Sequence, residues 1–438
     1  MRQLELFVDQ RSLFDKLCDP AYLKEGFKAV KRNGGSAGTD GVTVKVFACG
    51  LSDKLGELSR SLKDWTYQPS PVRRVEIPKP GKGSGVRLLG VPCIKDRVVQ
   101  ATLKILLEPL IDPSFSENSY GFRPGRSQRH AVEAAQQIVN TGKEYVVDID
   151  MSKFFDRVNH DRLIHRLSQF VSDKRILRIV GMTLRSGVIK DGVFYTSPEG
   201  TVQGSPLSPL LSNIVLDELD KELERRGLSF CRYADDCNIF LGSQKAAQRV
   251  MQSIGEFIEN KLKLVINREK SKVALSRFVK FLGMTIIAGK LVISAGSMER
   301  AMAKVKELTP RGTSLPLEKT VGRINDWYMG WSGYYLITQD RSQLGKIEAH
   351  IRRRLRSRII GEQKRKRHLC RKLVKRGVSK SLAARTVYSN KGRWALSHTP
   401  AMERAYPNRW FIEQMGLKIR SGEKHPHWSS SGRRIRTT

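Results

Sequence analysis

The sequence predicts an α+β protein that ends in a helical, strongly basic region. Through about residue 290, short apolar segments suited to strands alternate with longer segments of helical periodicity, such as residues 127–139, which stop before Gly142. Farther along, apolar residues recur at helical spacing among many Lys and Arg residues. A chain of 438 residues with 39% hydrophobic residues is long enough for two or three domains with sizeable cores.

Two acids at a tight turn are the first feature that indicates a candidate functional site. Asp235 and Asp236 end the stretch Tyr-Ala-Asp-Asp, and residues 228–232 and 237–241 on either side are predicted to form short strands. Neighbouring carboxylates without a basic partner repel each other unless a cation lies between them. A solvated turn is the simpler interpretation of this pair, so a metal site needs further carboxylates.

A third carboxylate follows another predicted strand. Residues 145–149 have the apolar pattern of a buried strand, Asp150 falls near its end, and the chain then turns into a helix that begins around Asn159. Asp148 shares a strand face with Asp150, so the pattern alone leaves open which of the two binds metal. Three carboxylates that meet in a cleft can hold two magnesium ions about 3.5–4 Å apart and support a phosphoryl displacement. The expected chemistry is nucleotidyl transfer.

The charge balance predicts a polyanionic partner. The chain has 79 Lys and Arg against 43 Asp and Glu, a net charge of +36. A protein this basic is expected to bind nucleic acid with an affinity that falls steeply with salt. The sequence has no long apolar run and no signal-peptide pattern at its start, so we expect a cytoplasmic protein without membrane association.

Further motifs follow one another along the chain. They are Asn-Gly-Gly-Ser-Ala-Gly-Thr-Asp-Gly at 33–41, Ile-Pro-Lys-Pro at 77–80, the segment 87–100, Tyr-Gly-Phe-Arg-Pro-Gly-Arg-Ser at 120–127, Gln-Gly-Ser-Pro-Leu-Ser-Pro at 203–209, Asn-Arg-Glu-Lys-Ser at 267–271 and Phe-Leu-Gly at 281–283. Together with the two acidic segments, this series resembles that of the reverse transcriptases encoded by bacterial group II introns, which are also called maturases. The resemblance extends over nearly the whole chain.

The resemblance implies a right-hand polymerase. Residues 1–290 would form the fingers and palm with an antiparallel palm sheet, residues 291–376 an α-helical thumb or maturase X domain, and residues 377–438 a small basic DNA-binding segment with a disordered tail. Many relatives end in an HNH nuclease built around paired cysteines. The six cysteines of this chain include no Cys-x-x-Cys pair, so we expect the type that lacks this endonuclease.

The resemblance also implies a catalytic triad of Asp150, Asp235 and Asp236 with two Mg²⁺ ions per active site. Asp150 and Asp235 would bind both metals, and the backbone carbonyl of Ile149 or Met151 would complete a metal shell. Asp148, which shares a strand face with Asp150, is then expected to be structural.

Cations of the fingers would hold the nucleoside triphosphate. Lys79 and Arg87 match positions at which the family binds dNTP phosphates, and a guanidinium group suits bidentate contact with phosphate. The Gly-rich stretch 80–86 between them is predicted to be a hairpin tip, and Lys82 within it competes with Lys79 for this role.

The resemblance assigns four other residues to the substrate, template and primer. Phe155 would stack under the incoming sugar and exclude a 2′-hydroxyl, whereas Phe154 is expected in the core. Gln203 and Gly204 would lie along the template and the nascent pair, where glycine permits close backbone approach. Tyr233 would support the primer end.

Residues 346–376 carry 14 Lys or Arg against two acids. A helix with an apolar stripe at Ile347, Ile351, Leu355 and Ile359 can present its basic face merely to solvent. We favour a phosphate partner because so many cations with so few acids repel each other. The candidate contacts with intron RNA are Arg352, Arg353, Arg354, Arg356, Lys364, Arg365, Lys366 and Arg367.

Aromatic residues occur on both sides of this basic region. Trp327, Trp331, Tyr334 and Tyr335 have helical spacing, and we expect them in the core rather than as platforms for base stacking. In residues 389–411, cations lie beside aromatic residues, a combination that suits single-stranded nucleic acid.

The implied function is that of an RNA-directed DNA polymerase that copies group II intron RNA and binds this RNA as a maturase, promoting splicing and mobility. The expected partners are intron RNA, an RNA template with a DNA primer, target DNA and dNTP substrates. Two alternatives stay open. One is a domesticated reverse transcriptase in DNA repair, phage defence or diversity generation; the other is an RNA-binding maturase that acts only in splicing.

Overall fold

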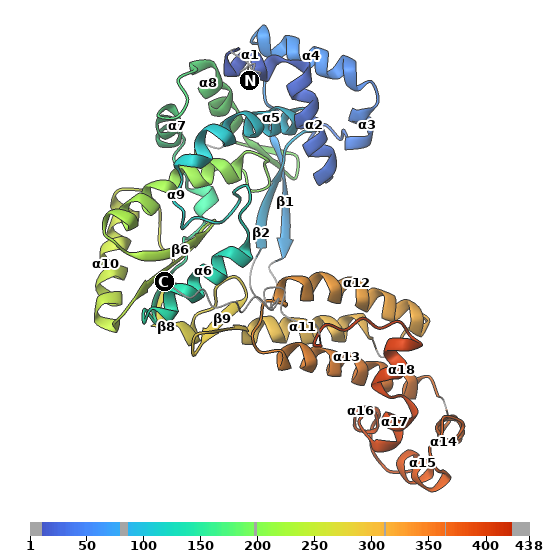
Figure 1. Ribbon diagram of the computed structural model, residues 1–438. Coiled ribbons are helices and arrows are strands. Elements are labelled where there is room, and N and C mark those ends of the chain that lie inside the picture. The colour runs from blue at the N-terminus through green and yellow to red at the C-terminus, as the bar shows by residue number, and fades with distance from the viewer. Residues whose placement is uncertain (1–10, 79–85, 197–198, 311, 364, 423–438) are drawn as a thin grey trace, which may run out of the picture. The chain divides into compact units, whose positions relative to one another are not determined.

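The computed structural model describes residues 11–78, 86–196, 199–310, 312–363 and 365–422 (Figure 1). The chain divides into two compact units, residues 1–274 and 275–438. Each unit has its own hydrophobic core.

The first unit mixes helices and strands. Its helices are α1 (Leu13–Cys18), α2 (Pro20–Asn33), α3 (Val44–Ala48), α4 (Leu51–Lys63), α5 (Ile94–Ile111), α6 (Gln128–Asn140), α7 (His160–Ser168), α8 (Lys174–Leu184), α9 (Ser208–Arg225) and α10 (Gln244–Asn260), with short 3₁₀ turns at Asp112–Ser114 and Phe154–Asp156. Its strands are β1 (Val72–Pro78), β2 (Val86–Val91), β3 (Tyr145–Ile149), β4 (Val188–Lys190), β5 (Val193–Tyr195), β6 (Ser229–Tyr233), β7 (Asp236–Leu241) and β8 (Lys272–Leu275).

These strands form two four-stranded sheets. One has the order β2-β1-β4-β5, in which only the β1–β4 pair is parallel. The other has the order β6-β7-β3-β8, and β7 pairs antiparallel with both β6 and β3. The second sheet therefore brings the two predicted acidic segments onto neighbouring strands.

Local signals explain where the predicted helices begin. Ser127 caps α6 by accepting a hydrogen bond from the backbone N–H of His130, and Asn159 caps α7 in the same way with Arg162. After α6, Gly142 adopts a positive φ of 91°, which favours glycine. The predicted strands before and after the acidic turn are confirmed as β6 and β7, and the strand before Asp150 as β3.

The second unit begins with a 3₁₀ turn and an antiparallel hairpin and is otherwise helical in its described part. Its elements are the turn Ser276–Phe278, β9 (Met284–Ile287), β10 (Lys290–Ile293), α11 (Ala295–Leu308), α12 (Leu317–Tyr335), α13 (Ser342–Gly361), α14 (Lys366–Lys375), α15 (Lys380–Val387), α16 (Arg393–Leu396), α17 (Pro400–Ala405) and α18 (Asn408–Glu413). Mixed α and β structure with antiparallel pairing confirms the α+β class at this level.

The predicted apolar stripe of α13 is buried. Ile347, Ile351, Leu355 and Ile359 are each at most 2% exposed and lie in the core of the second unit. This core extends from α11 to Leu417, so α11–α14 share it with α15–α18.

Trp327, Trp331, Tyr334 and Tyr335 of α12 are partly buried, and the two tryptophans pack against the core. Trp327 and Trp331 are partly buried against the core, and their rings stack with centroids 5.9 Å apart. The Tyr334 hydroxyl donates to the carbonyl of Leu282, and the Tyr335 hydroxyl bonds to Ser297 Oγ. In the described part of the chain, no helix is long and apolar enough to span a membrane.

Candidate functional site

The acidic turn is a two-residue hairpin loop at the edge of a buried sheet. Tyr233 of β6 pairs with Asp236 of β7, which leaves Ala234 and Asp235 as the loop. Ala234 has a positive φ of 57°, a left-handed conformation that costs energy for a residue with a Cβ atom. Contacts from neighbouring residues must therefore stabilise this conformation of Ala234.

Register brings Asp150 to the turn. The last paired residue of β3, Ile149, lies opposite Cys237 of β7. Asp150 comes directly after Ile149, so the antiparallel register puts it level with Asp236. Two acidic segments more than 80 residues apart in sequence thus meet at one end of the sheet.

Electrostatics also connect Asp150 with Asp235. The pKa of Asp235 is raised, first by burial of its carboxyl group and then by the negative charge of Asp150. Its own backbone N–H and the cations Arg87 and Arg232 act in the opposite direction. Burial and the charge of Asp150 therefore make the ionised form of Asp235 less favourable than that of an exposed Asp, and a further positive charge would favour it.

The donor set suits a divalent metal. Carboxylate oxygens are the ligands that Mg²⁺ prefers, and a bound cation relieves the repulsion between Asp150 and Asp235. Asp236 is exposed at the start of β7, and the buried Ile149 and Met151 flank Asp150. Within the described ranges, no three His, Cys, Asp or Glu side chains form a ready metal-holding group. The pair Asp150 and Asp235 is thus the centre of the candidate site.

The segment 266–271 holds the backbone around Asp150. The Asp150 carbonyl accepts from the N–H of Asn267 at 2.9 Å, and the Asp150 N–H donates to Ser271 Oγ at 3.0 Å. Lys270 Nζ lies 3.9 Å from Asp150 Oδ2, and Met151 forms an isolated bridge with Ile266. The sequence alone gives no role to the motif at 267–271, and its contacts in the structure position Asp150.

The side chain of Arg232 stabilises the turn through a buried network of hydrogen bonds. Its guanidinium is fully buried, and Nε and Nη2 donate to the two carboxylate oxygens of Asp220 at 2.7 and 2.5 Å. Nη1 donates to the carbonyl of Ala234 at 2.9 Å and to Asn213 Oδ1 at 3.0 Å, and Nη2 also donates to Ser119 Oγ at 2.8 Å. One side chain thus joins α9, the loop before α6 and the strained residue of the turn.

The charge of Arg232 is retained despite its burial. Burial alone would lower the pKa of the guanidinium, but the charge and hydrogen bonds of Asp220 outweigh this effect and raise the pKa above its usual value. Sequence reasoning did not single out Arg232. The available signal was a lone Arg inside a predicted apolar strand, which requires a buried acid elsewhere in the fold.

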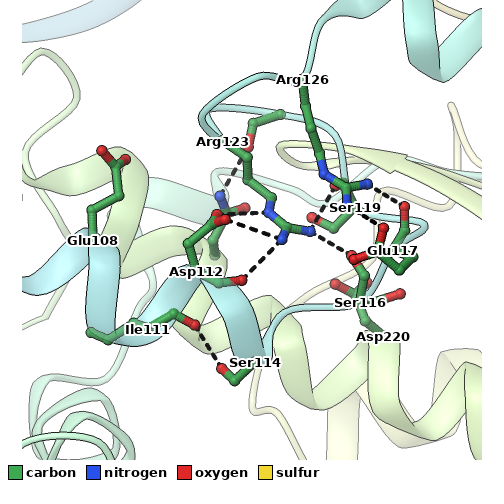
Figure 2. A network of polar contacts seen from close by, with 12 residues as sticks. Glu108, Ile111, Asp112, Ser114, Ser116, Glu117, Ser119, Arg123, Arg126 and Asp220 are labelled. Carbon is green, nitrogen blue, oxygen red and sulfur yellow. Dashed lines mark hydrogen bonds and ion pairs between the residues drawn. The ribbon is translucent and has the colours of Figure 1, made fainter. Parts of the chain in front are cut away.

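A second buried arginine, Arg123, holds the loop whose Ser119 contacts Arg232, and Figure 2 shows Arg123 within this loop. Arg123 Nε donates to Asp112 Oδ1 at 2.7 Å, and Nη1 donates to the carbonyls of Ser116 at 2.6 Å and Ser119 at 3.1 Å. Because the carbonyl of Ser119 is held by Arg123 and its hydroxyl by Arg232, the two networks meet at this residue.

The same loop packs against the acidic turn through Gly121. A Cβ atom at Gly121 would lie 2.3 Å from the backbone nitrogen of Ala234, so only glycine fits here. Asn213 Nδ2 donates to the Gly121 carbonyl at 2.9 Å. The motif Tyr-Gly-Phe-Arg at 120–123 therefore serves as a scaffold for the turn.

The structure describes the surroundings of three residues that are expected to contact the nucleotide or the template. Arg87 is exposed on β2 and lies within electrostatic reach of Asp235. The carbonyl of Gln203 accepts from the N–H of Gly90 at 2.7 Å. Gly204 has a φ of 114°, and a Cβ atom there would lie 2.7 Å from the Gly90 carbonyl oxygen. Gly204 thus allows close backbone approach to β2.

The aromatic candidates differ in burial. Phe154 is 3% exposed and belongs to the core, whereas Phe155 is only partly buried and meets Phe154 edge to face. Tyr233 is also partly buried, and its ring centroid lies 6.3 Å from that of the exposed Phe122. Lys79 and the alternative Lys82 lie outside the described residues.

The basic candidates on α13 are mostly engaged within the protein. Arg353 lies over the Trp394 ring at 4.0 Å, and Arg354 Nε donates to Thr309 Oγ1 at 2.8 Å. Arg352 is partly buried, and burial lowers its pKa.

Arg356 has the least access to solvent of these arginines. It is 5% exposed and donates to the carbonyl of Tyr406 and to Asn408 Oδ1. Its contacts join α13 to the segment 406–408. Arg365, Lys366 and Arg367 are exposed at the start of α14, and Lys364 lies outside the described residues.

Two family models match this chain. Residues 77–286 match the model described as reverse transcriptase (RNA-dependent DNA polymerase). Residues 298–377 match the model described as group II intron, maturase-specific domain. The first match includes every described residue of the candidate site around the acidic turn.

The chain is also similar to curated relatives and to a chain of a solved structure. Protein YkfC of Escherichia coli (strain K12) is 32% identical over 297 residues, covering 59% of this chain and 77% of YkfC. Group II intron-encoded protein LtrA of Lactococcus lactis subsp. cremoris is 28% identical over 326 residues, covering 60% of this chain and 53% of LtrA, about half of its length. A chain of a partial Cas6-RT-Cas1–Cas2 complex matches with a TM-score of 0.38 and 27% identity, covering 58% of this chain and 44% of that one.

Proposed function

The chain belongs to the family of bacterial group II intron-encoded reverse transcriptases and maturases, and we propose that Asp150 and Asp235 form the centre of its polymerase site. Family membership makes it an RNA-directed DNA polymerase with a maturase role. Its parent intron RNA is the proposed template, and a DNA primer and dNTPs are the proposed co-substrates.

The observation that carries this proposal is the approach of two carboxylates that lie at the ends of separate strands. The β3–β7 register supports it, as does the effect of the Asp150 charge on the pKa of Asp235. Asp236, the third acid of the proposed triad, lies level with Asp150 in the same register. The hydrogen bond from the buried Arg232 to the Ala234 carbonyl also favours a structured site over a merely solvated turn.

Each side chain has a proposed task during nucleotide addition. Asp150 and Asp235 would supply oxygen ligands to two Mg²⁺ ions, with the carbonyl of Ile149 or Met151 as a further ligand. Bound Mg²⁺ would lower the pKa of the primer 3′-hydroxyl and neutralise charge on the triphosphate. Arg87, together with Lys79, would bind the triphosphate through charge-assisted hydrogen bonds.

Four further residues would shape the substrate pocket. The partly exposed Phe155 would form the wall beneath the incoming sugar, because a roomy pocket rejects an added hydroxyl weakly. Gln203 and Gly204 would contact the template and nascent pair, and Tyr233 would support the primer end.

The proposed domain assignment follows the same comparison. Residues 1–290 would be fingers and palm, residues 291–376 the thumb or maturase X domain, and residues 377–438 a basic DNA-binding segment. The matches at 77–286 and 298–377 support the first two assignments. We propose intron RNA and target DNA as partners and the bacterial cytoplasm as the location.

The proposal separates polymerase activity from splicing. Asp235→Ala combined with Asp236→Ala is expected to abolish cDNA synthesis on a primed RNA template, because it removes the metal ligands. Splicing of the parent intron RNA should stay near the wild-type rate, because RNA binding depends on basic residues elsewhere. The two activities are measured on the same purified protein. Equal loss of both in a folded variant would refute this separation.

A further inference from the structure

A cationic cavity of about 610 Å³ lies within the second unit between α11, α13 and the start of α16. Ligand sites typically measure about 300–1,000 Å³. The charged and aromatic residues that line it are Lys306, His350, Arg354, Arg358, Arg393 and Trp394. No Asp or Glu is among the described residues of its wall.

The arginines of the cavity wall are held in place by the protein. Arg354 Nε donates to Thr309 Oγ1 at 2.8 Å, and Nη2 bonds to the Thr309 carbonyl. Arg358 bonds to the hydroxyl of Thr320 and lies 3.4 Å from Glu362, which offsets its charge. Lys306, Arg354 and Arg393 therefore supply most of the charge that an anionic group would meet.

Trp394 forms the aromatic part of the wall. The Arg353 guanidinium lies 4.0 Å from its ring centroid, and Arg353 Nη2 donates to its carbonyl at 3.3 Å. His350 meets the ring edge to face at 5.7 Å. The ring is thus oriented by its neighbours while staying partly exposed.

Two other cavities lack this combination. The cavity beside α10 has Glu256 and Glu259 in its wall. The cavity beside α8 has no aromatic residue among its described lining residues, and its Arg185 pairs with Asp161. Excess positive charge next to an aromatic ring of the wall distinguishes the cavity at Trp394.

We propose that this cavity binds one nucleotide of single-stranded RNA, with its phosphate at Lys306, Arg354 and Arg393 and its base against Trp394. Cations with one aromatic ring match the phosphate and base of a nucleotide. The inference rests on the proposed maturase function and adds a defined RNA subsite to it.

RNA fits this cavity better than DNA on two grounds. Nine of its twelve lining residues fall within 298–377, the range matched by the maturase-specific model. Ser357 and His350 offer polar groups to a 2′-hydroxyl, by which proteins tell RNA from DNA. Burial and the nearby Arg354 and Arg353 lower the pKa of His350, so its imidazole is neutral near pH 7 and able to accept a hydrogen bond.

The test is the affinity of the full chain for single-stranded oligouridylate RNA at low ionic strength. Lys306→Gln with Arg393→Gln changes two exposed cavity residues. The matched control, Lys319→Gln with Arg323→Gln, removes the same charge from exposed positions on α12. We expect the cavity variant to bind RNA about tenfold more weakly than the control variant. Equal affinities of the two variants would overturn the proposal.

A second variant tests the aromatic contact. Trp394→Ala should weaken RNA binding by about 5- to 150-fold, and Trp394→Phe should restore most of the loss because it keeps a stacking face. If both variants bind like the wild type, the base does not contact Trp394. Thermal unfolding of each variant separates loss of binding from loss of fold.

Competition identifies the ligand class. Unlabelled RNA should displace the probe at a lower concentration than DNA of the same sequence or polyglutamate. Displacement by polyglutamate at equal charge would make the cavity a general anion site, and equal competition by DNA would overturn the preference for RNA. Primer extension by the same variants stays measurable, so failure of this subsite is distinguishable from failure of the polymerase proposal.

Discussion

At the scale of single residues, the acidic turn is stabilised by a buried cation, Arg232. Arg232 donates to the Ala234 carbonyl and neutralises Asp220. It therefore stabilises both the left-handed residue of the turn and the charge of α9. We regard Arg232 as a positioning residue.

Arg232→Lys should lower the rate of nucleotide addition more than it lowers affinity for the template. Lysine keeps the charge beside Asp220, but it lacks the planar fork that reaches Asp220 and Ala234 together. We expect a decrease of about tenfold or more in kcat, with a higher Mg²⁺ concentration needed for half-maximal rate. Steady-state extension of a primed RNA template at varied Mg²⁺ measures both.

A control variant separates positioning from general loss of stability. Arg166→Lys weakens the 3.2 Å ion pair with Asp217 of α9, and this pair does not touch the turn. If it changes kcat and the Mg²⁺ dependence as strongly as Arg232→Lys does, the positioning role is wrong.

The site also has a stability cost that a second substitution should reveal. Asp235→Asn removes a charge that burial and Asp150 disfavour. Without Mg²⁺, the variant should therefore unfold at a higher temperature, by about 2–4 °C for a gain of about 1 kcal/mol. Differential scanning calorimetry in EDTA measures this change.

Saturating Mg²⁺ should shrink or reverse the difference, because the metal stabilises the wild type more than the variant. A lower unfolding temperature for Asp235→Asn in EDTA would contradict the repulsion between Asp235 and Asp150.

At the scale of elements, α13 combines a buried apolar stripe with arginines that serve different purposes. Leu355→Ala should destabilise the second unit by about 2–5 kcal/mol, because Leu355 is fully buried in its core. Five of the six tryptophans lie beyond residue 275, so tryptophan fluorescence during denaturant unfolding reports this unit. Arg367→Ala, at an exposed position, should change stability by less than about 0.5 kcal/mol. Equal effects would contradict the assigned packing.

Elements were predictable where their signals are local. The caps at Ser127 and Asn159 and the stripe of α13 lie within a few residues of the structure they specify. The burial of Arg356 had no such signal, because its partners Tyr406 and Asn408 are about 50 positions away. The basic helix alone does not show that Arg356 is buried, and the RNA contacts of this region stay a prediction.

The same distinction between local and long-range signals applies to the candidate site. The strands beside Asp150 and Asp235 were predictable from apolar patterns, but their register is a long-range property. Arg232 joins residues 12 and 113 positions away, Asp220 and Ser119. Spacing alone does not reveal such a network.

At the scale of the whole molecule, the two units with separate cores contain the features of two different functions. The first contains the paired acids, and the second contains the maturase-specific match and the cationic cavity. The net charge of +36 suits a chain that binds polyanions at more than one place. We therefore expect the acids to act in catalysis rather than in RNA binding.

Single-turnover extension of a DNA primer on an RNA template by Asp150→Asn tests this most directly. The variant keeps the size of the side chain and removes its charge. We predict a rate lower by about 10³-fold or more with Mg²⁺ and dNTPs, while affinity for the primed template stays at the wild-type value. Extension by Asp150→Asn at a rate close to that of the wild type would contradict the assignment of the polymerase site.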